Sequence, residues 1–175
     1  PRVLKNLMNP LSTHDTVRAL TAVSGEELPG TKDERAEFRL RDPETAKKRL
    51  RLAAALQYTL PGVPCLYYGD EAGAEGCEDP FNRRFYPWNN ADEELVGFFR
   101  GLGKLRARPE LNGGGIRVIR ACDGLVEFTR GEGLRVLANA TEIAVPLGEA
   151  VTDLATGNVT REAAPLSTVV WEERK

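Results

Sequence analysis

The sequence lacks the features that define several common classes of protein. Its 175 residues include only three cysteines and one histidine, and no apolar run is long enough for a transmembrane helix. The cysteines are widely spaced and odd in number, which predicts neither a disulfide framework nor a CxxC metal site. We expect Cys65, which lies in an apolar run, to belong to the core.

The sequence also has no excess of either charge. Lys and Arg number 24 against 26 Asp and Glu, a net charge of −2. This balance excludes a strongly basic surface, and we expect neither nucleic acid nor a membrane as a partner. The first residues, Pro1-Arg2-Val3-Leu4, are not a signal peptide and include no initiator Met, so we expect the sequence to begin within a longer chain.

What is present is the composition of a folded protein, 41% hydrophobic and 29% charged, with length for one domain or two small ones. Residues 3–11 predict a buried strand, then a short helix capped by Asp15-Thr16, and then a loop over residues 24–41. A longer helix is predicted between Asp42, its N-cap, and Pro61-Gly62. A second buried strand over residues 63–68 completes a strand–helix–strand pattern, which implies parallel pairing.

The second half of the sequence predicts a different architecture. A long polar loop over residues 69–90 leads into an amphipathic helix, capped by Asn90 and ending by Pro109. Short alternating runs then predict strands separated by turns, at 116–121, 125–129, 134–138, 143–146, 151–154 and 167–171. Such spacing favours a small antiparallel β-sandwich, so we expect a domain boundary near residues 109–114.

Polar residues follow both strands of the first half. His14 and Asp15 come after the first strand and Asp70-Glu71 after the second, at the carboxyl ends where sites form in parallel α/β proteins. A single His is more often a structural residue, and Asp70-Glu71 fit loop hydrogen bonds and capping slightly better than chemistry. For Asp79 and Arg83, spacing alone favours a local ion pair in a turn. Glu75 and Glu78 fit solvated loop charges.

These segments together resemble the alpha-amylase family of glycoside hydrolases. Asn9 through His14-Asp15-Thr-x-Arg18 is similar to the family's fourth conserved stretch, and Leu60 through Asp70-Glu71 is similar to its eighth barrel strand. The stretch from Gly76 to Trp88, with Asp79-Pro-x-x-Arg83, resembles the loop that follows. The neopullulanase or cyclomaltodextrinase branch is the most similar. The resemblance covers essentially the whole chain, since the tail is similar to the family's C-terminal β-sandwich.

The resemblance implies a role for each of four residues. Asp15 matches the third carboxylate, which stabilises the oxocarbenium-like transition state, and His14 matches a histidine that bonds to the same sugar. Asp79 and Arg83 match a pair that binds a neighbouring glucose of the α-glucan substrate. For Arg18 the structural role, support of the loop at the strand end, fits better. No metal or cofactor is implied in this chain, although calcium is compatible with a full-length parent.

The resemblance also implies that the catalytic set is incomplete. A retaining glycosidase needs a nucleophile and an acid/base carboxylate, and in this family both lie on earlier barrel strands. We therefore expect residues 1–110 to be the last two β/α units of a (β/α)₈ barrel and residues 111–175 to be the β-sandwich. We expect the chain alone to be inactive. Its open strand edge and uncovered apolar helix face predict self-association.

Two other functions compete with this interpretation. The first is a non-catalytic, amylase-like binding or scaffold protein, which the retention of all four residue types disfavours. The second is a sugar-binding module built on the sandwich. Its only aromatic candidates are Phe128 and Trp171, and both lie in apolar runs that predict core positions.

Overall fold

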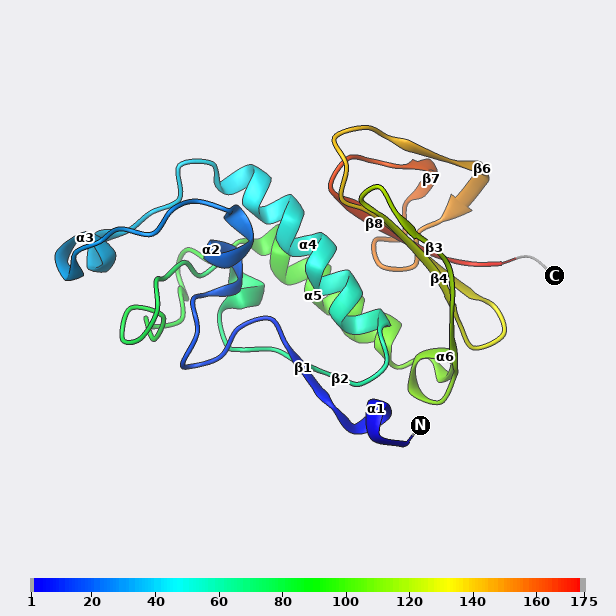
Figure 1. The fold of residues 1–175 in the computed structure, drawn as a ribbon, viewed down its shortest axis with the longest axis horizontal. Helices are drawn as coiled ribbons and strands as arrows, with labels where there is room; N and C mark the ends of the chain where they lie inside the picture. Colours follow the sequence, from blue (N-terminus) through cyan, green and yellow to red (C-terminus); the bar gives the residue numbers. More distant parts are fainter. Residues whose placement is uncertain (1, 174–175) are drawn as a thin grey trace.

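Two long helices form the centre of the computed structural model, which describes residues 2–173. Helix α4 (Pro43–Thr59) and helix α5 (Glu93–Arg106) lie side by side (Figure 1). The Asp42 side chain caps α4 as predicted, accepting a hydrogen bond from the Thr45 amide (3.1 Å), and Pro43 occupies the first turn. Helix α5 is capped by Asp92, whose Oδ1 accepts from the Leu95 amide (2.9 Å), and not by Asn90.

The two strands of the first half pair in parallel, as predicted, but they are short. Strand β1 (Met8–Pro10) pairs with β2 (Val63–Cys65), with Met8 opposite Val63. The prediction of a buried strand over residues 3–11 was wrong, because helix α1 (Arg2–Asn6) takes its first part and Met8 is 69% exposed. A helical turn makes its hydrogen bonds locally, whereas a strand needs neighbours on both edges to be buried. Cys65 is only partly buried.

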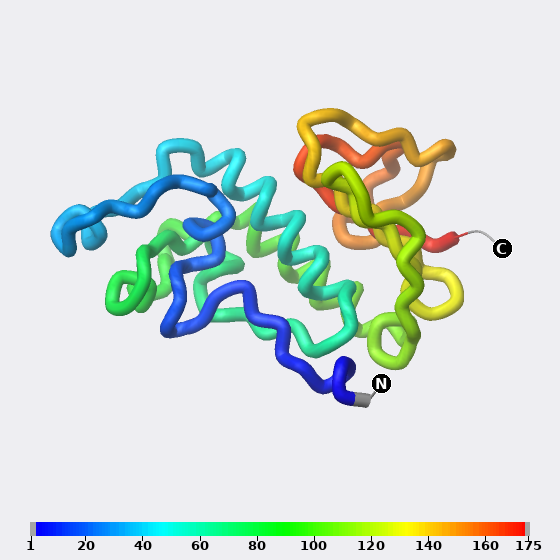
Figure 2. The backbone as a smooth tube through the Cα atoms, viewed as in Figure 1, coloured from blue at the N-terminus to red at the C-terminus, as the bar shows by residue number. Residues whose placement is uncertain are grey.

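The segment between β1 and α4 is more regular than the sequence pattern indicated. Helix α2 (Ala19–Ser24) begins later than expected, and no side chain of Asp15 or Thr16 caps it. Helix α3 (Lys32–Glu37) forms within the expected loop, because Thr31 and Glu34 make a capping box. A 3₁₀ turn η1 (Asp70–Ala72) follows β2, and a single turn α6 (Pro109–Asn112) follows α5. Figure 2 traces this path from the N-terminal end to the sheets.

The second half consists of antiparallel sheets, as predicted. Strands β3 (Ile116–Cys122), β4 (Leu125–Arg130), β5 (Leu134–Asn139) and β8 (Ser167–Glu172) form a four-stranded sheet in that order. Strands β6 (Val145–Thr152) and β7 (Val159–Ala163) form a separate pair. The expected strands at 143–146 and 151–154 are one irregular strand, and β7 was not predicted. The sequence of β7, Val-Thr-Arg-Glu-Ala, has too few apolar residues to show the alternation that is typical of a half-buried strand.

The helices and the four-stranded sheet share one core. Leu50, Ala54, Leu102 and Leu105 of the helices belong to the same buried cluster as Phe128, Val136 and Val170 of the sheet. The other face of the sheet packs on β6 and β7 through Leu137, Val169 and Trp171. A Cβ added at Gly101 would overlap the Ala155 carbonyl oxygen, so glycine permits the close contact between α5 and the sheet region.

A buried arginine joins the two halves by hydrogen bonds. Arg130 of β4 is 2% exposed, and its guanidinium donates to the carbonyls of Thr59 and Leu111 at the ends of α4 and α6. These carbonyls are among those that a helix terminus leaves unpaired. Within residues 2–173, no helix is long and apolar enough to span a bilayer.

Candidate functional site

The structure brings the four predicted site residues together at the loops beyond β1 and β2. Arg83 lies between the two carboxylates, with its Nη2 3.5 Å from Asp15 Oδ1 and its Nε 2.9 Å from Asp79 Oδ1. His14 Nε2 is 3.1 Å from Asp15 Oδ2. The Asp79–Arg83 contact is the local ion pair that spacing favoured, but Arg83 also reaches a segment nearly seventy positions earlier in the sequence.

These side chains are open to solvent and offer complementary hydrogen-bonding groups. His14 and Asp15 are 65% and 70% exposed, and Arg83 and Asp79 are 46% and 50% exposed. Carboxylates accept hydrogen bonds and a guanidinium donates several in a fixed plane. The cluster can therefore contact a ligand that carries hydroxyl groups in several directions.

Asn82 holds the two segments of the site in position. Its side chain is fully buried, and Nδ2 donates to the carbonyls of His14 (2.8 Å) and Thr16 (2.7 Å). Arg83 Nε adds a further hydrogen bond to the His14 carbonyl (3.1 Å). Sequence reasoning missed Asn82, because an asparagine in a polar loop gives no local signal of burial. Its only pointer was its position inside the Asp79–Arg83 motif.

Arg18 supports the loop after β2 from the protein interior, which agrees with the structural role predicted for this residue. It is fully buried, its Nε donates to the Asn82 carbonyl (2.6 Å), and its Nη1 donates to the Tyr68 carbonyl. The guanidinium carbon also lies 4.3 Å from the centre of the Tyr67 ring, in cation–π geometry. Arg18 thus connects the start of α2 to both parts of the loop after β2.

Asp70 is an internal partner of Arg18 and not a second surface acid. It is 2% exposed, accepts a hydrogen bond from Ser12 Oγ (2.5 Å) and lies 3.5 Å from Arg18 Nη1. Burial raises the pKa of this carboxyl, and the opposing effects of Ser12 and Arg18 do not cancel that rise. The reading of Asp70 as a loop hydrogen-bonding residue is confirmed.

Glu75 and Glu78 are not the solvated loop charges that were predicted. Both are partly buried. Glu75 accepts a hydrogen bond from the Leu40 amide (3.1 Å), and Glu78 forms an ion pair with Arg35. The long loop after β2 therefore binds the segment around α3, which explains why a stretch without regular structure has a defined path.

Aromatic side chains are exposed on this loop and buried in the sheets. Phe85 is 98% exposed and Trp88 is 81% exposed, and the Tyr86 and Trp88 ring centres are 4.6 Å apart. Phe128 and Trp171 are buried, as predicted, so neither offers a sugar platform on the sheets. Among the described residues, no three His, Cys, Asp or Glu side chains are grouped to hold a metal ion.

Comparisons with known sequences agree on one group of enzymes, although no family model matches the chain. An amylopullulanase of Thermoanaerobacter thermohydrosulfuricus is 41% identical over 104 residues, which are 59% of this chain and 7% of the relative. A cyclomaltodextrinase of a Bacillus species is 33% identical over 109 residues, covering 61% and 16%. Neopullulanase 2 of Thermoactinomyces vulgaris is 34% identical over 106 residues, covering 59% and 15%.

Solved structures extend the likeness to nearly the whole chain. The type III pullulan hydrolase from Thermococcus kodakarensis matches 94% of this chain with 28% of its own, at a TM-score of 0.70 and 26% identity. The maltogenic amylase from S. marinus matches 94% with 22% of its own, at a TM-score of 0.72 and 23% identity. The second match shows the fold alone.

Sequence and fold together define the class of protein to which this chain is similar: glycoside hydrolases acting on glucans. More narrowly, the chain resembles the C-terminal region of alpha-amylase family enzymes in the neopullulanase and cyclomaltodextrinase branch. It spans less than a fifth of the length of these curated relatives.

Proposed function

We propose that this chain forms one wall of the active site of a retaining α-glucan hydrolase. The main support for the proposal is that Arg83 contacts both Asp15 and Asp79 and so joins two loops into one exposed polar cluster. The relatives are named amylopullulanase, cyclomaltodextrinase and neopullulanase, which supports an α-glucan as substrate.

Each residue of the cluster has a chemically reasonable role in this proposal. Positive charge develops on the sugar ring in an oxocarbenium-like transition state, so the Asp15 carboxylate favours that state over the bound substrate. His14, next to Asp15, would hydrogen-bond to the same ring. Asp79 and Arg83 would bind the hydroxyls of the neighbouring glucose. Asn82 and Arg18 would position these groups without touching the sugar.

The proposal divides the chain into two parts. Residues 1–110 would be the last two β/α units of a (β/α)₈ barrel, and residues 111–175 would be the β-sandwich that follows it. The parallel β1–β2 pair with its helices supports the first assignment, and the two antiparallel sheets support the second. The nucleophile and acid/base carboxylates would come from preceding strands. The 175-residue chain would then bind glucan without cleaving it.

Two measurements test the proposal. In the full-length parent, Asp15→Asn should lower kcat by about a hundredfold or more, because one stabilising electrostatic group is lost from the transition state. A matched change at an exposed acid of the sheet region, Asp123→Asn, should leave turnover unchanged. Unchanged turnover in the Asp15 variant would refute the role of Asp15. Release of reducing sugar from pullulan by the 175-residue chain would refute the division of the catalytic set.

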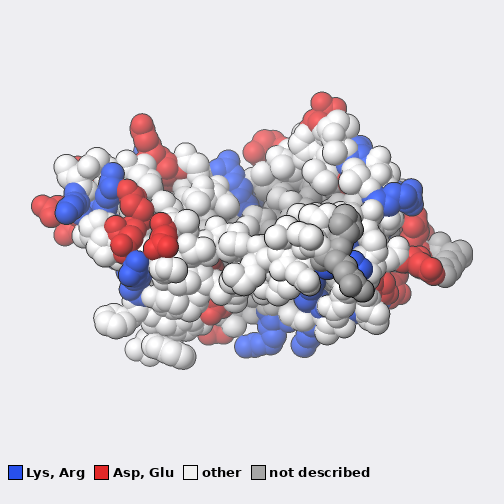
Figure 3. Space-filling model, turned by 60° about the horizontal axis from the view of Figure 1, so that its bottom comes forward, with Lys and Arg blue, Asp and Glu red and all other residues white. Residues whose placement is uncertain are grey.

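We also propose that the chain associates with itself through the surface around β1 and β2. Leu7, Met8, Val63 and Leu66 are exposed there, and Figure 3, turned to bring this side forward, shows a largely uncharged middle. Contiguous exposed apolar side chains of this kind mark surfaces that become covered.

A further inference from the structure

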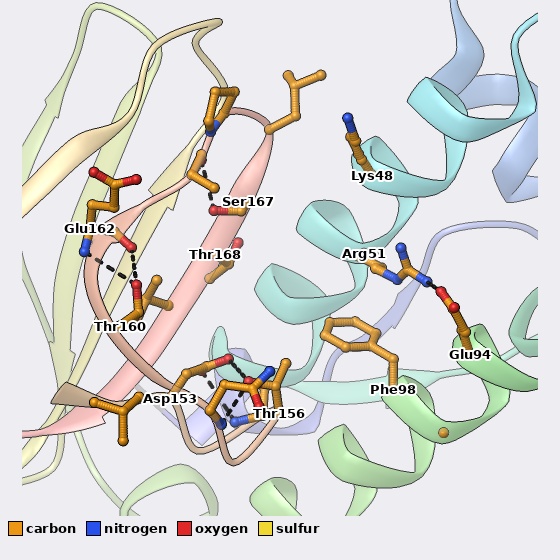
Figure 4. A pocket seen from close by; sticks show the side chains of 18 residues that line it. Lys48, Arg51, Glu94, Phe98, Asp153, Thr156, Thr160, Glu162, Ser167 and Thr168 are labelled. Carbon is orange, nitrogen blue, oxygen red and sulfur yellow. Dashed lines mark hydrogen bonds and ion pairs between the residues drawn. The ribbon is translucent and has the colours of Figure 1, made fainter.

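A cavity of about 820 Å³ lies between the central helices and the sheet region (Figure 4). Lys48 and Arg51 of α4 and Phe98 of α5 line one wall. Thr160 of β7, Ser167 and Thr168 line the other. The cavity shares no lining residue with the Asp15 cluster, and its volume is in the range that holds a small molecule.

The charges of the cavity disfavour an anionic ligand. Its two cations, Lys48 and Arg51, face three carboxylates, and Arg51 already pairs with Glu94 (Nη2–Oε2 3.2 Å). Asp153 is already satisfied, because it accepts from Thr156 Oγ1 in its own turn (2.6 Å) and from the Val170 amide of β8 (3.0 Å). A phosphate or carboxylate would therefore meet more negative than positive charge.

The remaining lining combines an aromatic ring with hydroxyl groups. Phe98 points into the cavity from α5 (Figure 4) and is held by an edge contact with Phe99, with ring centres 6.3 Å apart. Thr160 and Ser167 donate their hydroxyl protons to backbone carbonyls (2.7 and 2.8 Å). Thr160 Oγ1 also accepts from the Glu162 amide (3.2 Å), so Ser167 offers the more open acceptor. Thr168 Oγ1 is covered and has no hydrogen-bond partner in the structure.

Thr168 lies on the face of β8 that meets the helices. Side chains two positions apart on a strand share a face, and Val170 of the same strand packs in the core with α4 and α5. Thr168 lines the cavity, but its Oγ1 atom is covered by neighbouring protein atoms, so the polar groups open to a ligand are those of the other lining residues. A ligand with both donors and acceptors would match this lining.

We propose that this cavity is a second carbohydrate-binding site, which takes a neutral glucose unit of an α-glucan. A pyranose presents an apolar face that matches Phe98, and its hydroxyls both donate and accept, which matches the mixed polar wall. The choice of α-glucan over another neutral sugar rests on the function proposed above. The site would hold a glucan chain at a distance from the catalytic cluster and would not take part in bond cleavage.

The test is a maltotriose titration of the isotopically labelled 175-residue chain, followed by amide NMR shifts. We expect saturable shifts at Gly97 and Ser167, separate from any shifts at His14 and Asp15, and smaller shifts with inorganic phosphate. A Cβ added at Gly97 meets open space, so Gly97→Leu should fold and should weaken binding at the cavity by about tenfold or more. Gly103, on the same helix with equally open space and no place in the cavity, gives the matched control Gly103→Leu.

The two proposals fail independently in this experiment. Shifts confined to His14 and Asp15 would support the catalytic cluster and overturn the second site. Shifts at Gly97 and Ser167 that persist in Gly97→Leu, or that phosphate produces more strongly than maltotriose, would also overturn it. The wild-type shift map alone decides whether the cavity is occupied, even if Gly97→Leu does not fold.

Discussion

The strands of the helical half and those of the sheet half bury their apolar side chains to different extents. In the four-stranded sheet, Phe128, Val136 and Val170 lie opposite one another on adjacent strands and are fully buried. In the β1–β2 pair, Met8 lies opposite Val63 and both are exposed. The sheet half has layers on both faces of its central strands, whereas the β1–β2 pair has strand edges with no neighbour among residues 2–173.

This difference shows where the stability of the helical half comes from. Its strands contribute little burial, so its order depends on helices α4 and α5 packed on the sheet and on buried polar networks around Arg18 and Arg130. The candidate site lies on the loops that the Arg18 network holds. The following predictions test this division, from the largest expected effect to the smallest.

Removing Arg18 should have the largest effect. Arg18→Ala leaves Asp70 buried without its cation and removes two hydrogen bonds to the loop, so the free energy of unfolding should fall by about 3–5 kcal/mol. Chemical denaturation measures this loss. Arg100→Ala, at an exposed position on α5, is the control and should change it by less than about 0.5 kcal/mol. Equal effects of the two changes would contradict a structural role for Arg18.

Adding a methyl group at the close contact between α5 and the sheet region should be the next most damaging change. Gly101→Ala places a methyl group against the Ala155 carbonyl, and the resulting shift of α5 should cost about 1–3 kcal/mol. Gly103→Ala on the same helix meets open space and should stabilise by up to about 1 kcal/mol, because alanine favours the helix. Thermal unfolding of both variants measures the difference. A stable Gly101→Ala variant would mean that the halves are not closely packed there.

Asp70 should make stability depend on pH in a defined direction. Burial raises its pKa in the folded state, so the folded state holds this proton more tightly than the unfolded state. The contribution of Asp70 is therefore most favourable below its unfolded pKa of about 4 and declines as pH rises from there through the folded pKa. Five other carboxyl groups have lowered pKa values and act in the opposite direction. The measurement is therefore the difference in unfolding free energy between the wild type and Asp70→Asn, which should decline as pH rises through this range. The opposite slope would mean that pairing with Arg18 outweighs burial.

The smallest effect on stability should come from the exposed strands, with a clear effect on association. Met8→Lys changes a side chain that is 69% exposed, so the free energy of unfolding should change by less than about 0.5 kcal/mol. The charge should reduce self-association through the β1–β2 surface, measured by analytical ultracentrifugation. Val159→Lys, at a 72% exposed position on β7, should leave association unchanged. Equal effects of the two changes would place the association surface elsewhere.

Several parts of the structure follow directly from local sequence. Helix α4 begins where Asp42 and Pro43 predict it, and α5 follows its apolar periodicity. Strands β3, β4, β5 and β8 form close to their predicted ranges, because side-chain alternation and turn residues act within a few positions. Short sequence motifs also indicated the resemblance to alpha-amylase family enzymes. Strand β7 and helices α1 and α3 were not predicted, because their patterns are short or irregular.

The sequence by itself determined the residue types of the candidate site and the order of most elements. Only the tertiary structure decided that the Asp79–Arg83 pair also reaches Asp15, that Asn82 is buried beneath His14, and that Asp70 faces Arg18 and not the solvent. These contacts join residues about fifty to seventy positions apart. Local periodicity carries no information about such pairs, since their distance depends on how the helices and loops pack, and burial then sets which polar groups remain open to a ligand.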